Sequence, residues 1–327
     1  MKEELVSIIV PCYNMEEKIK RLIQSLLNQN YSKLEIIFVN DGSKDNTENV
    51  LETYKQNLLD KGYEVVIINQ KNQGLGAAIN AGLAVFKGEY FCWPDADDYL
   101  EPDSIKLRVQ MMEKNPEVAV VSSDAFLRKS DSIEIINGKL SDFYPRSSEE
   151  NQFHLLLNEE SFFCSGCHMV RTRMFLEVNP QRHIYPAKRG QNWQLLLPLY
   201  YKYPRSYIDI PLYNYIDYVD SMSKNKDNLN NLVERYKEHY LILIETLKMI
   251  EKNEKVDLQN EIQNVKLKTI RNNYMAAVKY GNIDLAEENF KKLKKMKEIN
   301  NQDRVKYFIV KHKFLKVLLD RIMWRKQ

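Results

Sequence analysis

The sequence has little of what marks several large classes of protein. Its 327 residues include only 4 cysteines, too few for a disulfide scaffold, and no apolar run approaches the ~20 residues that span a bilayer. Lysine and arginine (48 residues) nearly balance aspartate and glutamate (45), and the net charge of +3 gives no sign of a nucleic-acid partner. Residues 1–4 lead into a strand-like segment instead of a signal peptide. We therefore expect a reduced, cytoplasmic setting.

The residues that are present are typical of a globular α/β protein. Hydrophobic residues make up 44% of the chain and charged residues 28%, which excludes a collagen-like or disordered chain. Short apolar runs, rich in β-branched residues except at 90–93, predict strands at 6–10, 34–39, 64–68, 90–93 and 118–121. Apolar residues at helical spacing predict helices at 15–29, 47–59 and within 72–86. This alternation predicts a mostly parallel sheet with helices on both faces.

The composition changes twice along the chain. Residues 126–225 are less regular and carry most of the prolines, so we expect loops and short elements over one end of the sheet. From residue 226 onward proline is absent and glycine is rare. The spacing of apolar residues there predicts a helical C-terminal module with helices at 228–250, 256–280, 283–298 and 303–324.

Polar residues follow four of the predicted strands at the point where each strand ends. The four segments are Pro-Cys-Tyr-Asn at 11–14, Asp-Gly-Ser at 41–43, Asn-Gln-Gly at 72–74 and Asp-Ala-Asp-Asp at 95–98. In an open parallel sheet, ligands bind outside the carboxyl ends of the strands. The sequence therefore predicts one polar pocket, built from four loops at a single edge of the sheet.

The acidic cluster at 95–98 is the sharpest of these signals. Asp95, Asp97 and Asp98 follow an apolar strand directly, and their carboxylates repel one another unless a cation lies between them. Mg²⁺ and Mn²⁺ bind oxygen ligands and share their coordination sphere with substrate phosphates, so such an ion would neutralise a diphosphate leaving group. The alternative is a solvated acidic turn in which Asp98 caps a helix that starts near Pro102. The other polar strand ends favour the metal site.

The motifs at these strand ends resemble those of family 2 glycosyltransferases of the GT-A fold. Four segments carry the resemblance, in the family's order and spacing: VSIIVPCYN, EIIFVNDGS, NQGLGAAINAG and GEYFCWPDADDYLEPDSI. It is strong over residues 5–125 and weak over 126–224. It implies a Rossmann-like GT-A domain, with a nucleotide-sugar-binding half at 1–125 and an acceptor-binding half at 126–225, followed by the helical module at 226–327. The implied reaction is an inverting transfer of a sugar from a nucleotide diphosphate, most simply a UDP sugar, to an acceptor hydroxyl.

The resemblance also assigns the residues that would hold the base and ribose of the donor. Pro11, Tyr13 and Glu16 would line the nucleotide base and ribose, and the aromatic ring of Tyr13 offers a face for stacking. Asp41 would accept a hydrogen bond from the N–H of a uracil-type base.

The sugar and diphosphate would lie over the next two loops. The segment from Asn72 through Gly74 to Asn80 would form the floor under the ribose and sugar, because glycine permits close approach of the backbone. Asp95 and Asp97 would be the catalytic D-x-D pair, which binds Mn²⁺ or Mg²⁺, and Asp97 would be the direct metal ligand.

The general base is the point at which this chain departs from the family pattern. The base is usually the Asp of a Glu-Asp pair at the start of a helix, and Gln191 and Asn192 occupy these positions here. An amide cannot take up a proton at neutral pH. Three explanations stay open: another carboxylate serves (Asp98, Asp217 or Asp220), the alignment is shifted, or the acceptor is positioned differently.

The same segment is nevertheless a candidate acceptor site. Gln191, Asn192 and Trp193 suit an acceptor because amides bind sugar hydroxyls and an indole packs on sugar faces. The alternative is an ordinary helix start with a tryptophan in the core.

The end of the sequence is basic and amphipathic. Over 303–326, cationic residues alternate with apolar residues at helical spacing. One hypothesis is peripheral contact with an anionic membrane, at the inner face of the plasma membrane, which would suit a lipid-linked acceptor. The other is a helix packed on the catalytic domain or in a homo-oligomer, with a solvated lysine face.

Two functions follow as hypotheses. The first is a metal-dependent glycosyltransferase that extends a glycan or lipid-linked acceptor in the synthesis of a bacterial surface polysaccharide such as a capsule. The second is a nucleotide-sugar-binding or assembly protein with little or no turnover, suggested by the amides at the expected position of the base.

Overall fold

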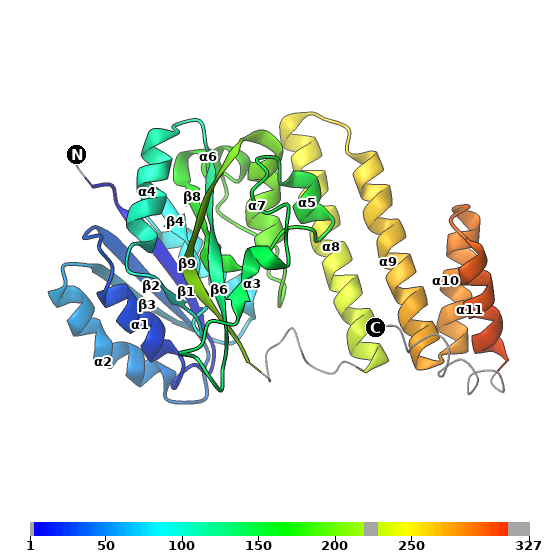
Figure 1. Cartoon of the computed structure of the whole chain (residues 1–327), viewed down its shortest axis with the longest axis horizontal. Coiled ribbons are helices and arrows are strands. Elements are labelled where there is room, and N and C mark those ends of the chain that lie inside the picture. The colour runs from blue at the N-terminus through cyan, green and yellow to red at the C-terminus, as the bar shows by residue number, and fades with distance from the viewer. Residues whose placement is uncertain (1–2, 219–227, 313–327) are drawn as a thin grey trace. The chain divides into compact units, whose positions relative to one another are not determined.

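The computed structural model describes residues 3–218 and 228–312. The chain forms two compact units, Met1–Lys224 and Asn225–Gln327. Figure 1 shows that strands and helices are mixed in the first unit, whereas the second is built from helices. The division of the first unit at residue 125 into donor and acceptor halves stays a prediction.

A nine-stranded sheet forms the centre of the first unit. Its strands are β1 Val6–Cys12, β2 Leu34–Asp41, β3 Glu64–Gln70, β4 Tyr90–Cys92, β5 Tyr99–Leu100, β6 Val120–Lys129, β7 Gly138–Lys139, β8 His168–Arg171 and β9 Arg205–Asp217. Their order in the sheet is β3-β2-β1-β4-β8-β6-β9-β5, and β7 pairs with β6.

The sheet is mixed, and its parallel part coincides with the predicted alternation of strands and helices. Strands β3, β2, β1 and β4 pair in parallel, as do β6 and β9. Strand β8 lies between β4 and β6 and runs antiparallel to both. The fold class is therefore confirmed. Strands β5, β7, β8 and β9 were not predicted, and the strand expected at 118–121 is instead the longer β6. The expectation of loops and short elements over one end of the sheet at 126–225 is thus partly wrong, because β8 and the 13-residue β9 lie within the sheet.

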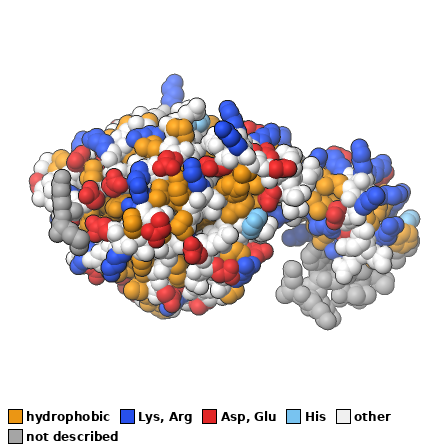
Figure 2. Space-filling model, turned by 90° about the horizontal axis from the view of Figure 1, so that it is seen from above, with side chains coloured by type: hydrophobic (Ala, Val, Ile, Leu, Met, Phe, Trp, Pro, Cys, Tyr) orange, Lys and Arg blue, Asp and Glu red, His pale blue; other side chains and the backbone are white. Residues whose placement is uncertain are grey.

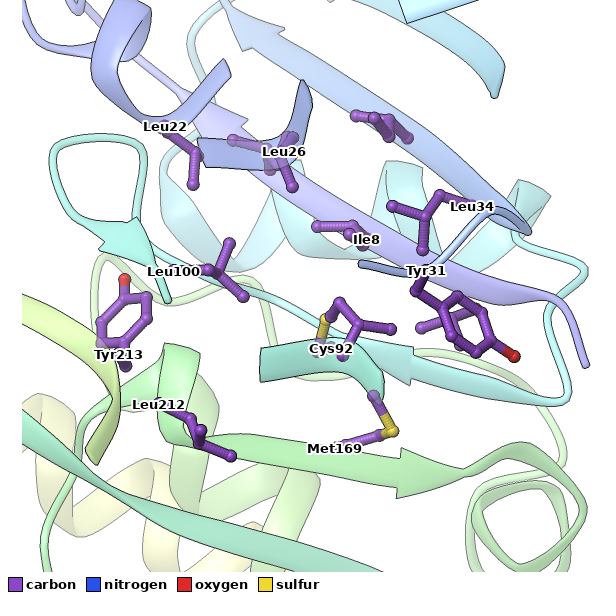
Figure 3. Packing of buried hydrophobic residues seen from close by; sticks show 14 of the residues in the cluster. Ile8, Leu22, Leu26, Tyr31, Leu34, Cys92, Leu100, Met169, Leu212 and Tyr213 are labelled. Carbon is purple, nitrogen blue, oxygen red and sulfur yellow. The ribbon is translucent and has the colours of Figure 1, made fainter. Parts of the chain in front are cut away.

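Helices cover the sheet of the first unit. They are α1 Ile19–Leu27, α2 Thr47–Asp60, α3 Leu75–Val85, α4 Ser104–Lys114, α5 Phe153–Leu157, α6 Thr172–Val178 and α7 Gln191–Lys202, with 3₁₀ turns η1 Leu140–Asp142 and η2 Ser165–Cys167. Alternation along β1 decides which face each helix covers. Ile8 belongs to the cluster that includes Leu22 and Leu26 of α1, and Figure 3 shows these side chains together with Leu100 and Tyr213.

The opposite face of β1 receives α3 at very short range. A Cβ added at Gly82 of α3 would lie 2.3 Å from Ile9 Cγ2, so only glycine lets the helix approach this closely. Helix α3, which follows the polar third loop, is thereby packed closely on this face of β1.

The second unit contains α8 Leu229–Glu254, α9 Gln259–Tyr280, α10 Ile283–Lys295 and α11 Asn301–Lys311. Gly281, with a φ of 71°, ends α9, and the side chain of Asn282 caps α10 by accepting from Leu285 N. Of the basic segment 303–326, residues 313–326 lie outside the described part, so its membrane or oligomer contact stays a prediction.

The surface agrees with the balanced charge of the sequence. On the face shown in Figure 2, acidic and basic side chains are interspersed. Within 3–218 and 228–312, no helix is both long and apolar enough to cross a bilayer.

Candidate active site

The strand directions bring several segments to one edge of the sheet. Strands β1, β2, β3 and β4 are parallel, so the loops that follow them leave from the same edge. Because β8 is reversed and β9 runs with β6, the residues just before β8 and those at the end of β9 lie at this edge too. Segments that are far apart in the sequence therefore meet the four predicted polar loops.

Hydrogen bonds join the loops after β1 and β2 into one structure. Asn14, in the left-handed region with a φ of 53°, donates from its backbone N to Ser43 Oγ (3.0 Å), and Lys44 N donates to Asn14 Oδ1 (2.8 Å). Asn46 N donates to Glu16 Oε2 (2.6 Å). Glu16, which was predicted to contact the nucleotide, therefore already stabilises the loop structure.

Two further residues predicted to line the base lie at the same edge. Pro11 is in β1 and only partly exposed. Tyr13 is 40% exposed, so part of this aromatic residue is accessible to a ligand.

Asp41 joins the second loop to the third. Its carboxylate is 3% exposed and accepts from Gln70 Nε2 (2.7 Å), from Gln73 N (2.9 Å) and from Gly74 N (2.8 Å). Gly74 has a φ of 91°, a conformation that favours glycine, and it is the cap residue of α3. A carboxylate has about four acceptor positions, so about one remains for a ligand N–H.

The floor predicted at 72–80 is tied to a segment that the sequence did not single out. Asn80 donates from Nδ2 to Ile184 O and accepts from Ile184 N, both at 2.8 Å, and Gly76 N donates to Ala187 O (2.9 Å). The amide of Asn80 thus holds the residues before α7 against α3, while the exposed side chain of Asn72 stays available to a ligand. No local pattern indicates this pairing.

The acidic turn is held by side chains from η2 and β9. Asp95 Oδ2 accepts from Ser165 Oγ (2.7 Å), and Asp95 N donates to the hydroxyl oxygen of Tyr213 (3.1 Å). Asp98 is 2% exposed and its Oδ1 accepts from Ile216 N (2.8 Å). The alternative of a helix cap at Asp98 is wrong, because α4 begins only at Ser104.

Burial and mutual repulsion perturb this turn. Burial, and next the charge of Asp97, raises the pKa of Asp95 to about 6, although the hydrogen bond from Ser165 opposes the shift. The pKa of Asp98 is raised well above its usual range, again by burial first and then by Asp97 and Asp95. A nearby cation would stabilise the ionised form of these buried, mutually repelling carboxyl groups.

Asp97 connects the acidic turn to the first loop. Its side chain is 27% exposed, and Lys18 Nζ lies 3.8 Å from Oδ2. The hydroxyl of Tyr218 donates to the backbone O of Asp97 (3.3 Å). The acidic turn therefore lies beside the loops that carry Tyr13 and Asp41, and it does not point away from them into solvent.

The carboxylates of the acidic turn fit a hard divalent cation whose remaining ligands are not protein side chains. Among the residues that the structure describes, no three His, Cys, Asp or Glu side chains gather into a metal site. Asp97, with Asp95 beside it, offers the carboxylate oxygens that Mg²⁺ and Mn²⁺ prefer, and such ions commonly complete their shell with phosphate and water.

Residues 7–178 match the sequence profile of glycosyl transferase family 2. The chain belongs to this family. It is 43% identical over 119 residues to an uncharacterized glycosyltransferase of Haemophilus influenzae, with 36% of each chain covered. It is 38% identical over 117 residues to the chondroitin synthase of Escherichia coli, covering 36% of this chain and 16% of that one. The chain thus matches only about a third or less of the length of these family 2 relatives.

Solved structures share the fold of this family 2 chain over nearly its whole length. Residues 1–349 of S. aureus TarS superpose with a TM-score of 0.56 at 18% identity, covering 96% of this chain and 92% of that one. The mannosyltransferase PcManGT of Pyrobaculum calidifontis, in complex with GDP-Man and Mn²⁺, superposes with a TM-score of 0.53 at 14% identity, covering 100% and 89%. At these identities the likeness shows the GT-A fold alone.

The start of α7, where the family pattern puts its base, faces the protein interior. Asn192 is 5% exposed; its Oδ1 accepts from Trp93 Nε1 (2.8 Å) and its Nδ2 donates to Phe163 O (2.5 Å). Trp193 is 4% exposed and donates from Nε1 to Leu156 O (3.1 Å). For these two side chains the structure shows the alternative, a helix start with a core tryptophan. Gln191 alone of the three is partly exposed.

The other carboxylates considered as a base differ in their position. Asp98 is buried and bonded to β9, so it faces protein. Asp217 is partly exposed at the end of β9. Asp220 lies outside the described residues.

Proposed function

We propose that this protein is a metal-dependent glycosyltransferase that moves a sugar from a nucleotide diphosphate donor, UDP in the first instance, to a glycan or lipid-linked acceptor with inversion. A relative named chondroitin synthase and a structural neighbour in complex with UDP-GlcNAc support a polysaccharide product and a UDP donor. The second neighbour, which holds GDP-Man and Mn²⁺, makes a guanosine donor the natural comparison.

One observation supports the proposal most directly: hydrogen bonds and an ion pair link the segments that follow the first four parallel strands. Lys18 Nζ lies 3.8 Å from Asp97 Oδ2, Asn14 N bonds to Ser43 Oγ at 3.0 Å, and the carboxylate of Asp41 accepts from Gly74 N at 2.8 Å. A hydrogen-bond acceptor for the nucleotide base (Asp41), an exposed aromatic residue (Tyr13) and an acidic turn thus share one edge of the sheet.

In this proposal the residues act by binding and orienting the donor. Tyr13 would stack on the base and Asp41 would accept from its N–H, while the backbone at Asn72 and Gly74 supports the ribose. Asp97, with Asp95 beside it, would hold Mn²⁺ or Mg²⁺, which when bound supplies neutralisation of the leaving diphosphate.

The proton of the acceptor hydroxyl needs a base within hydrogen-bond reach. Among the candidates in the described residues, Asp217 is the partly exposed carboxylate and Asp98 is buried. Gln191 is kept as an acceptor contact. Direct acceptor contacts by Asn192 and Trp193 are not part of the proposal, because the protein uses both side chains internally.

The test is a screen of UDP sugars and GDP-mannose with Mn²⁺ and with excess chelator, monitoring release of the nucleotide. We expect slow hydrolysis of one donor, its loss on chelation, and its loss in Asp97→Asn at unchanged melting temperature. The control is Asp60→Asn, at the exposed end of α2, which should match the wild type. The proposal is refuted if the wild-type protein binds no nucleotide sugar, or binds one but never consumes it, whatever acceptor is supplied.

A second function, nucleotide-sugar binding without turnover, has one observation in its favour. The position of the family's base holds Asn192, whose amide is bonded to Trp93 and to the backbone of Phe163. This hypothesis predicts that a nucleotide sugar raises the melting temperature but is never consumed, whatever acceptor is supplied.

A further inference from the structure

Lys18 occupies an unusual place for a lysine at the start of a helix. It precedes α1, and its ammonium lies 3.7 Å from the centroid of the Tyr218 ring and 3.8 Å from Asp97 Oδ2. Its side chain is 29% exposed. Tyr218 is itself held, because its hydroxyl donates to Asp97 O and accepts from Arg21 NH1, both at 3.3 Å.

The geometry separates this contact from an ordinary surface ion pair. Lys20, two residues further along, pairs with Glu17 at 3.9 Å, and the two side chains are 45% and 81% exposed. Such a pair is screened by water and contributes little. Lys18 is instead placed between a ring face and a carboxylate in a partly desolvated position, where a cation–π contact and an ion pair act on the same charge.

The carboxylate beside Lys18 is the one that the D-x-D motif assigns to the metal. An ammonium at Asp97 therefore has opposite effects on two ligands. It repels a divalent cation that binds alone, because both positive charges need the same carboxylate. It attracts a nucleoside diphosphate, whose phosphate oxygens accept charge-assisted hydrogen bonds from lysine.

We propose that Lys18 is a donor-binding residue whose ammonium neutralises Asp97 in the free protein and contacts the diphosphate of the nucleotide in the complex. The inference rests on the proposed function and adds to it a residue outside the D-x-D motif. It also gives Tyr218 a role, because the ring holds the ammonium at the place where the diphosphate would arrive.

The experiment measures two affinities in the full chain. Binding of Mn²⁺ alone is followed by the loss of its free EPR signal, and binding of UDP and of GDP is measured calorimetrically at saturating Mn²⁺. In Lys18→Met we expect Mn²⁺ alone to bind about tenfold more tightly and the preferred nucleotide about tenfold more weakly, from the loss of one unit charge. Lys18→Arg keeps the charge and should restore both affinities, and Lys20→Met is the matched control.

The opposite signs make the outcome decisive. The inference is overturned if both affinities of Lys18→Met stay within about twofold of the wild type or move in the same direction. Binding of neither UDP nor GDP by the wild-type protein would instead overturn the proposed function, and the inference with it. Normal nucleotide binding by the wild type with an unchanged Lys18→Met variant would remove the inference alone.

Discussion

Replacing Tyr213 by phenylalanine tests how the acidic turn is held in place. Tyr213 is fully buried in β9, and its hydroxyl oxygen accepts from Asp95 N at 3.1 Å. A side-chain hydrogen bond from this hydroxyl also lowers the pKa of Asp98, against the larger effect of burial. The substitution keeps the ring, which fills the space over Gly166, where an added Cβ would lie 2.1 Å from Tyr213 Cε2. Only the two hydrogen bonds are lost.

The magnitude follows from the groups left without a partner. A buried N–H or carboxyl oxygen that loses its partner costs about 1–3 kcal/mol, and the carboxyl group of Asp98 can reduce its share by protonation. We therefore expect the free energy of unfolding of the first unit to fall by about 2–3 kcal/mol. For a unit of this size, this corresponds to a melting temperature lower by about 5–10 °C.

Calorimetry of the metal-free protein measures the shift. The matched control is Tyr54→Phe in α2, where a partly buried ring packs on the same hydrophobic cluster, and it should change the melting temperature by less than about 2 °C. A Tyr213→Phe variant that melts within about 2 °C of the wild type would refute the reasoning, because the phenol would then not be what holds the turn. The same variant should bind Mn²⁺ more weakly, since Asp95 loses its fixed position.

Two further substitutions test the neighbouring contacts. Gly166→Ala places a Cβ 2.1 Å from the buried ring of Tyr213, so we expect a loss of about 3 kcal/mol or more in urea unfolding; an unchanged midpoint would show that the ring can yield. Asn80→Ala removes both hydrogen bonds to Ile184, so the segment before α7 should open more often. Trypsin should then cleave after Lys188 faster than in the wild type, as followed by mass spectrometry, and equal rates would contradict the role given to Asn80.

Local patterns in the sequence were enough to predict the parallel half of the sheet and the acidic turn. A short apolar run rich in β-branched residues indicates a strand on its own, and β1, β2 and β3 follow this pattern; β4 is a short apolar run of aromatic residues and cysteine. Because parallel strands end at one edge, the polar strand ends of these four runs could be grouped from the amino-acid order alone. The turn at Asp95 and Asp97 belongs to that group.

Contacts between distant segments were decided only by the tertiary structure. The turn before the reversed strand β8 brings Ser165 to Asp95, across 70 positions of the sequence. Strand β9 brings Tyr213 to Asp95, and the residue after it, Tyr218, contacts Asp97, across 118 and 121 positions. Periodicity within a segment carries no information about such pairs.

The direction of a side chain at a helix start was equally beyond the sequence. A polar residue can face solvent or satisfy a buried donor there, and Asn192 does the latter because Trp93 Nε1 needs an acceptor inside the core. Short local motifs thus determined the chemistry of the site. The side chains that hydrogen-bond or ion-pair with the acidic turn, Lys18 among them, reach it only because distant parts of the chain fold together.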